Sequence, residues 1–100
     1  LGALNSDQRY DLGRLAEVGG DAQVAGAQAD TILTGNSTHM LGLILASRTA
    51  LIRGDKKASD AFLARLARAE AAERKKQLPE YLLHENDIAQ ALTDWRQRGK

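Results

Sequence analysis

The chain has 100 residues and a mass of 10.8 kDa, with 43% hydrophobic residues and a formal net charge of +1. This is the size of one domain, and the hydrophobic fraction is large enough for a packed core, which excludes a disordered chain. The sequence has no cysteine, which excludes disulfides, thiolate zinc sites and cysteine nucleophiles.

Alanine and leucine dominate the hydrophobic residues and favour helices. Together they make up 32 of the 100 residues, whereas valine and isoleucine contribute six. Strands are built mainly from β-branched and aromatic residues, so the composition predicts an all-α protein. Seventeen of the hydrophobic residues are alanine, which buries little area, and the resulting core is thin. Small domains with thin cores often gain stability by self-association.

Two helices are expected in the first third of the chain. Asn5 or Ser6 can cap the first helix, and Gly19-Gly20 ends it. Its core-facing side is predicted to carry Leu12, Leu15, Ala16 and Val18. Asp21 caps a second, alanine-rich helix that ends at Gly35-Asn36. Its helically spaced positions are Val24, Ala25, Gln28 and Ile32.

The third helix is expected from about Thr38 to Arg53, with Ser37 as its cap and Gly54 as a left-handed residue after it. One broad apolar face of this helix contains Met40, Leu41, Ile44, Leu45, Leu51 and Ile52.

The fourth helix is expected to open at Ser59 or Asp60 and to be ended by Pro79. Its core residues are predicted to be Phe62, Leu63 and Leu66. A fifth helix carries Tyr81, Ile88, Leu92 and Trp95 and is expected to restart at Asn86.

Short loops place consecutive helices side by side, so we predict a compact antiparallel bundle of four to five short helices. A single domain covers residues 1–100, and the sequence shows no internal repeat. The chain begins at Leu1 without an initiator methionine or a signal peptide, which suggests a trimmed or excised domain of a longer protein. The longest apolar run, 43–46, is far below the roughly 18 residues of a membrane span, and we expect a cytoplasmic protein that does not bind membranes.

Charge is distributed unevenly along the chain. Residues 1–47 carry a net charge of −3, residues 48–78 of +5 and residues 79–100 of −1. One side of the fourth helix gathers four cations at helical spacing: Arg65, Arg68, Lys75 and Lys76. This stripe could bind nucleic-acid phosphates. Alternatively, local ion pairs with Glu70 and Glu73 and the helix dipole explain it as a solvated helix end.

Arg48 lies at the centre of the apolar face of the third helix. A buried guanidinium must be paired, so Arg48 either reaches the edge of the bundle, pairs within the chain or meets an acidic group on a second chain. In the last case this face is a partner-binding surface that contains Met40, Ile44, Arg48 and Leu51.

The sequence contains little that predicts catalysis. His39 and His84 are the two histidines, and neither belongs to an HxxxH or HExxH motif, so both are expected at the surface and no metal or other cofactor is predicted. No nucleophile elbow or glycine-rich phosphate loop is present, and no small-molecule substrate is evident.

These observations favour a non-enzymatic protein-interaction module with a regulatory, adaptor or accessory role. Its partner would be another protein chain or a second copy of itself, as in a homodimer. The alternative is a DNA-binding accessory protein that uses the basic stripe of the fourth helix.

Overall fold

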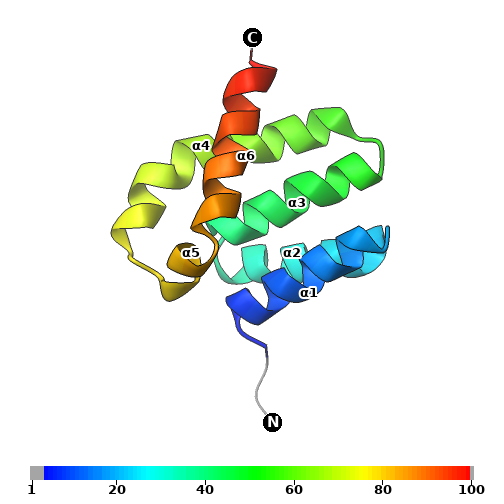
Figure 1. Ribbon diagram of the computed structural model, residues 1–100, viewed down its shortest axis with the longest axis horizontal. Coiled ribbons are helices and arrows are strands. Elements are labelled where there is room, and N and C mark those ends of the chain that lie inside the picture. The colour runs from blue at the N-terminus through cyan, green and yellow to red at the C-terminus, as the bar shows by residue number, and fades with distance from the viewer. Residues whose placement is uncertain (1–3, 100) are drawn as a thin grey trace.

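The computed structural model describes residues 4–99, and all regular secondary structure within them is helical. The helices are α1 (Ser6–Val18), α2 (Ala22–Gly35), α3 (Met40–Ile52), α4 (Lys56–Lys75), α5 (Pro79–Leu83) and α6 (Glu85–Arg98) (Figure 1). The prediction of an all-α bundle is confirmed. One helix more is present than predicted, because the expected fifth helix is divided at His84. None of the helices in the described range has the length and hydropathy that crossing a bilayer requires.

The first two helices begin where the sequence predicts. The side-chain oxygen of Asn5 accepts a hydrogen bond from the backbone N–H of Gln8 at 2.8 Å, and the Gln8 side chain accepts one from the Asn5 backbone at 3.0 Å. Asp21 caps α2 by accepting from the backbone N–H of Val24 at 3.1 Å. Both helix starts are therefore determined by local hydrogen bonds.

The start of α3 differs from the prediction. The helix begins at Met40 rather than near Thr38, and His39 rather than Ser37 is its N-cap. Nδ1 of His39 accepts a hydrogen bond from the backbone N–H of Leu41 at 3.2 Å, which places the imidazole at the helix terminus.

The fourth helix is also displaced from its predicted bounds. Asp55 accepts a hydrogen bond from the backbone N–H of Ala58 at 3.0 Å, so α4 begins a turn earlier than the predicted start at Ser59. At the other end α4 stops at Lys75. Pro79 does not stop this helix but opens α5, where its missing N–H is tolerated.

The pair α1 and α2 is repeated by α3 and α4 at an offset of 34 residues. α1 and α3 both have 13 residues and begin at positions 6 and 40, and α2 and α4 begin at 22 and 56. Gly20 and Gly54 precede the second helix of each pair with φ values of 75° and 76°. The two pairs therefore correspond in their helix starts and turn conformation, a correspondence that the residues themselves did not predict. Between 6–35 and 40–69 the identical pairs are few: Arg14/Arg48, Ala16/Ala50, Gly20/Gly54, Asp21/Asp55 and Ala27/Ala61.

α3 lies at the centre of the core. It packs against α2 and α4, and α1 and α6 also contact it. Ten of its 13 residues are buried, on all sides of the helix. The neighbouring helices therefore cover most of the apolar face from which the sequence predicts a partner-binding surface.

α1 turns a different face to the core than predicted. Tyr10 and Gly13 are buried, whereas Leu12 and Leu15 are exposed. A Cβ atom at Gly13 would lie 2.4 Å from Cδ2 of Leu45, so glycine permits α1 to approach α3 this closely.

α6 crosses α3 and α4 obliquely instead of lying antiparallel beside them (Figure 1). Ile88 and Leu92 are buried, and Trp95 packs partly buried against the core. The first turn of α6 reaches α1, where Asp87 accepts a hydrogen bond from the Tyr10 hydroxyl at 2.7 Å.

Candidate functional site

Two of the four residues predicted to bind a partner are enclosed within the chain. Met40 and Ile44 are 0% and 2% exposed and belong to the core. This corrects the prediction for these two residues, because the other helices already cover them. Arg48 and Leu51 remain accessible, with 41% of the Arg48 side chain exposed.

Arg48 is paired within the chain at the edge of the bundle. Its Nε donates a hydrogen bond to Oε1 of Glu17 at 2.6 Å. The second oxygen of Glu17 lies 3.0 Å from Nε of Arg14, so this carboxylate serves the arginines at corresponding positions of the two helix pairs. Two of the predicted alternatives for Arg48 therefore hold together: the side chain forms an ion pair within the chain, and it reaches solvent at the edge of the bundle. Neither outcome needs a second chain.

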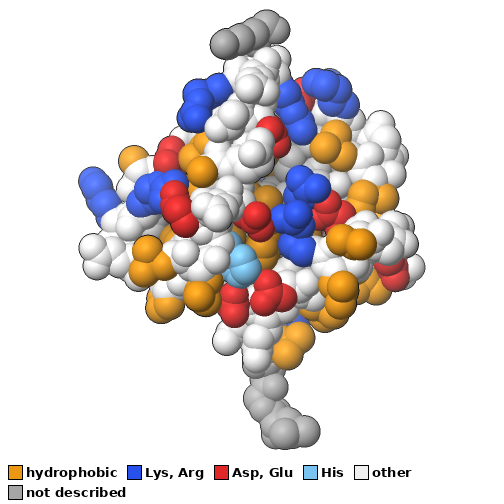
Figure 2. All heavy atoms as spheres, in the orientation of Figure 1, with side chains coloured by type: hydrophobic (Ala, Val, Ile, Leu, Met, Phe, Trp, Pro, Cys, Tyr) orange, Lys and Arg blue, Asp and Glu red, His pale blue; other side chains and the backbone are white. Residues whose placement is uncertain are grey.

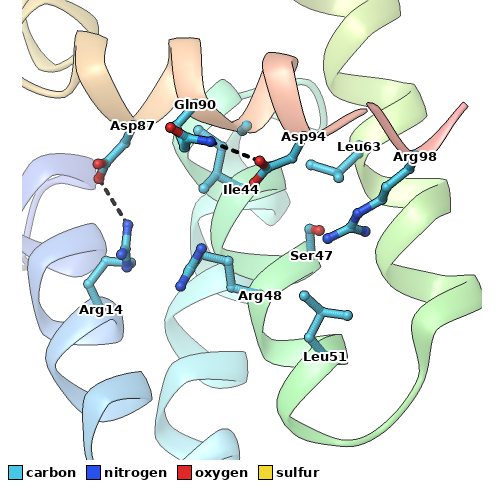
Figure 3. A pocket seen from close by; sticks show the side chains of 11 residues that line it. Arg14, Ile44, Ser47, Arg48, Leu51, Leu63, Asp87, Gln90, Asp94 and Arg98 are labelled. Atoms are coloured by element: carbon cyan, nitrogen blue, oxygen red, sulfur yellow. Dashed lines mark hydrogen bonds and ion pairs between the residues drawn. The ribbon is translucent and has the colours of Figure 1, made fainter. Parts of the chain in front are cut away.

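A pocket of about 130 Å³ lies between α1, α3, α4 and α6 (Figure 3). Its charged lining residues are Arg14, Arg48, Asp87, Asp94 and Arg98. Nη1 of Arg14 donates to Oδ2 of Asp87 and to the hydroxyl of Tyr10, both at 2.9 Å. Burial, together with the hydrogen bond to Asp87, raises the pKa of Tyr10 well above its ordinary value. The hydroxyl therefore remains protonated and continues to donate to Asp87.

On the α4 side of this pocket an arginine is likewise hydrogen-bonded to a carboxylate and a hydroxyl. Nη1 of Arg98 donates to Oδ1 of Asp60 at 2.9 Å and to Oγ of Ser59 at 3.0 Å. The Ser59 hydroxyl also lies 2.7 Å from that of Ser47. This buried serine is therefore engaged by a guanidinium and another hydroxyl, whereas an activated nucleophile needs an adjacent base. The polar groups here hold α6 against α3 and α4.

The predicted basic stripe on α4 contains both engaged and exposed side chains. Nη2 of Arg65 donates to the backbone oxygen of Ser37 at 2.8 Å. Nζ of Lys76 lies 2.6 Å from Oε2 of Glu73. Arg68, Lys75 and Lys76 are exposed. Because Lys76 is paired with Glu73, Arg68 and Lys75 are the stripe residues best placed for a phosphate contact.

Glu73 is a buried carboxylate, which corrects its predicted place in an exposed ion pair. It is 2% exposed and accepts hydrogen bonds from Tyr81 at 2.6 Å, Thr38 at 2.8 Å, Asn36 at 3.3 Å and Lys76 at 2.6 Å. Burial acts to raise the pKa of Glu73, but the hydrogen bonds from Lys76, Tyr81 and Thr38 outweigh it and lower the pKa. The spacing from Lys76 was visible in the sequence, whereas the contacts with Asn36 and Thr38 come from the fold.

The two histidines occupy different environments. His39 is buried, which corrects its predicted surface position, and its Nε2 lies 2.9 Å from Oε2 of Glu80. His84 joins α6 to α1, because its Nε2 lies 2.6 Å from Asp7 and 3.5 Å from Asp11. The possible ligand atoms of His84, Asp7 and Asp11 lie within 4.8 Å of one another, a separation that a metal ion could use. The short contact of Nε2 with Asp7 joins the start of α6 to α1.

The first helix pair exposes large apolar side chains on the side that faces away from α3. We call this surface the outer face and define it by Leu12, Leu15, Val18 and Val24, all of which are exposed. Leu15 and Val18 are 70% and 84% exposed. Figure 2 shows hydrophobic side chains gathered over α1 at the lower right of the view. The prediction that Leu12, Leu15 and Val18 form the core-facing side of the first helix is therefore wrong.

Neither a known protein family, nor a curated protein, nor a solved structure matches this chain.

Proposed function

We propose that this chain is a non-enzymatic protein-interaction module, with a regulatory, adaptor or accessory role, that binds another protein through its outer face. The observation that carries the proposal is the exposure of Leu12, Leu15, Val18 and Val24 at one end of a stack of repeated helix pairs. Clustered exposed apolar side chains on a small domain mark interaction sites.

The position of these residues in the repeat explains why their exposure indicates a binding surface. In stacked helix pairs each pair covers an apolar side of its neighbour, and a pair at the end of a stack needs a polar outer side to remain soluble. The first pair of this chain has an apolar outer side instead. A protein partner on that side would bury these residues. Each of the three pocket arginines is already hydrogen-bonded to a carboxylate, Arg14 to Asp87, Arg48 to Glu17 and Arg98 to Asp60, and the proposal assigns them no reaction.

A display library of helical peptides, selected against the wild-type chain, tests the proposal. We expect selected peptides to lose at least about tenfold in affinity for the double variant Leu15→Ser/Val18→Ser, because burial of each apolar side chain contributes to binding. Leu82→Ser is the matched control, since Leu82 is 79% exposed on α5, away from the outer face. Selected peptides that bind the double variant and the control equally would contradict the proposal.

A second candidate function is the binding of double-stranded DNA, which the exposure of Arg68 and Lys75 on α4 favours. The affinity for duplex DNA, measured by fluorescence anisotropy, should then fall steeply with salt. The variant Arg68→Gln/Lys75→Gln should reduce the slope of log K against log salt by about 2, since each phosphate contact contributes about 0.9. An unchanged slope would exclude these two residues as phosphate contacts.

A further inference from the structure

The second helix pair shows what covers the surface that the first pair leaves open. Thr49 on α3 corresponds to Leu15 on α1 by the offset of 34 residues. Thr49 is 2% exposed because α2 lies over it, and a Cβ atom at Gly26 of α2 would be 3.4 Å from Cγ2 of Thr49. Nη2 of Arg53 also donates to the backbone oxygen of Ala22 on α2 at 3.2 Å. At Thr49, therefore, a helix covers the position that corresponds to Leu15, whereas Ile52, which corresponds to Val18, is 38% exposed.

The net charges of the two helix pairs indicate whether a helix that binds the outer face of the first pair would be cationic or anionic. Residues 6–35 carry a net charge of −3, whereas residues 40–69 carry +4. The internal interface thus places an acidic pair on a basic pair. At the outer face, Asp11 has 63% of its side chain exposed, and Asp21 is exposed at the turn after Val18. An acidic surface of this kind attracts a cationic partner.

We propose that the outer face binds a cationic amphipathic helix of a partner protein. This inference rests on the proposed interaction function and adds the chemical class of the partner. The apolar stripe of that helix packs on Leu12, Leu15 and Val24, and its lysine or arginine side chains lie beside Asp11 and Asp21.

The same charges disfavour a second copy of this chain on the outer face. A twofold axis through this surface would bring two helix pairs, each with a net charge of −3, against one another. Like charges across an interface oppose association, whereas a cationic helix is attracted.

A pair of synthetic peptides tests the inference on the complete chain. Both are helices of roughly 18 residues with leucine and alanine on one face, and they differ only in having lysine or glutamate on the other face. Fluorescence anisotropy at about 50 mM and about 300 mM salt measures their affinities. We expect the lysine peptide to bind at least about tenfold more tightly than the glutamate peptide at the lower salt concentration and to weaken at the higher one.

Three variants locate this binding on the outer face. Leu15→Ser should weaken the lysine peptide at least about tenfold, whereas the control Leu82→Ser should leave its affinity unchanged. Asp11→Asn should weaken it severalfold at low salt and have little effect at high salt. Circular dichroism confirms that each variant is folded.

Each alternative outcome overturns the inference. Equal affinity for the lysine and glutamate peptides would show that charge does not select the partner. A dimer in sedimentation velocity that Leu15→Ser dissociates would assign the outer face to a second copy. If library-selected helices of other chemistry bind through Leu15 while the lysine peptide does not bind, the interaction function stands and the cationic partner is refuted. If neither library nor designed peptides bind through Leu15, both are refuted.

Discussion

Replacement of Glu73 by glutamine should destabilise the fold severely although the two side chains have nearly the same shape. The carboxylate is 2% exposed, and its two oxygens accept hydrogen bonds from four donors. Oε1 accepts hydrogen bonds from Asn36 and Tyr81, and Oε2 accepts hydrogen bonds from Thr38 and Lys76. In Glu73→Gln one oxygen becomes an NH₂ group, which faces two donors instead of accepting from them.

The expected loss follows from these contacts. A hydrogen bond to a charged group contributes about 1.5–3 kcal/mol, and a donor left without an acceptor in a buried site costs about 1–3 kcal/mol. Thr38 can rotate its hydroxyl and Lys76 can turn to solvent, which reduces the loss. We therefore expect Glu73→Gln to lower the free energy of unfolding by about 2–4 kcal/mol and the melting temperature by roughly 10–25 °C.

Urea unfolding followed by circular dichroism measures this loss, with Glu70→Gln as the matched control. Glu70 pairs with Arg74 on the surface of the same helix, and its replacement should cost less than about 0.5 kcal/mol. The pKa of Glu73 is lowered in the folded state, so its contribution is complete above the unfolded pKa of about 4.3 and is lost as the pH falls through the folded value. The variant should lack this acid-dependent component. Equal losses for Glu70→Gln and Glu73→Gln would refute the reasoning.

Three further substitutions test the packing by urea unfolding. Arg48→Met should change the free energy of unfolding by less than about 1 kcal/mol, because its ion pair is partly exposed and Glu17 retains a second arginine; a loss above about 3 kcal/mol would contradict this. Gly13→Ala should destabilise by about 2 kcal/mol despite the higher helix propensity of alanine, since the added Cβ meets the buried side chain of Leu45; increased stability would contradict the close approach. Trp95→Ala should cost about 3 kcal/mol, and a loss below about 1 kcal/mol would mean that the indole contributes little to the core.

The sequence by itself determined the helical class and the local signals that begin and end several helices. Asn5 and Asp21 cap α1 and α2 as predicted, and Gly54 takes the left-handed conformation after α3. These signals act through hydrogen bonds and backbone sterics within a few residues, so they can be read without knowledge of the fold. The expected restart of the last helix near Asn86 is likewise close to the observed start of α6 at Glu85.

Local sequence signals do not predict which face each helix buries. Leu12, Leu15 and Val18 form an apolar side of α1 that any helical wheel places in a core, but α1 packs through Tyr10 and Gly13. The decisive quantity is the distance between two helices at a glycine, which depends on the partner residue Leu45 far along the chain. The same dependence on distant elements explains why most of the apolar face of α3 is covered, whereas Leu51 and Ile52 at its end stay exposed.

The candidate site was predictable only in part. The sequence identified Arg48 as a charge that needs a partner, but the partner, Glu17, is 31 residues away, and only the stacking of α1 beside α3 brings the two together. The 34-residue repeat was hidden because it is preserved in the helix starts and in the turn conformation and hardly in residue identity. Tertiary structure alone decided which side of the first helix pair stays uncovered, because that depends on where the neighbouring pair lies, and no local pattern encodes it.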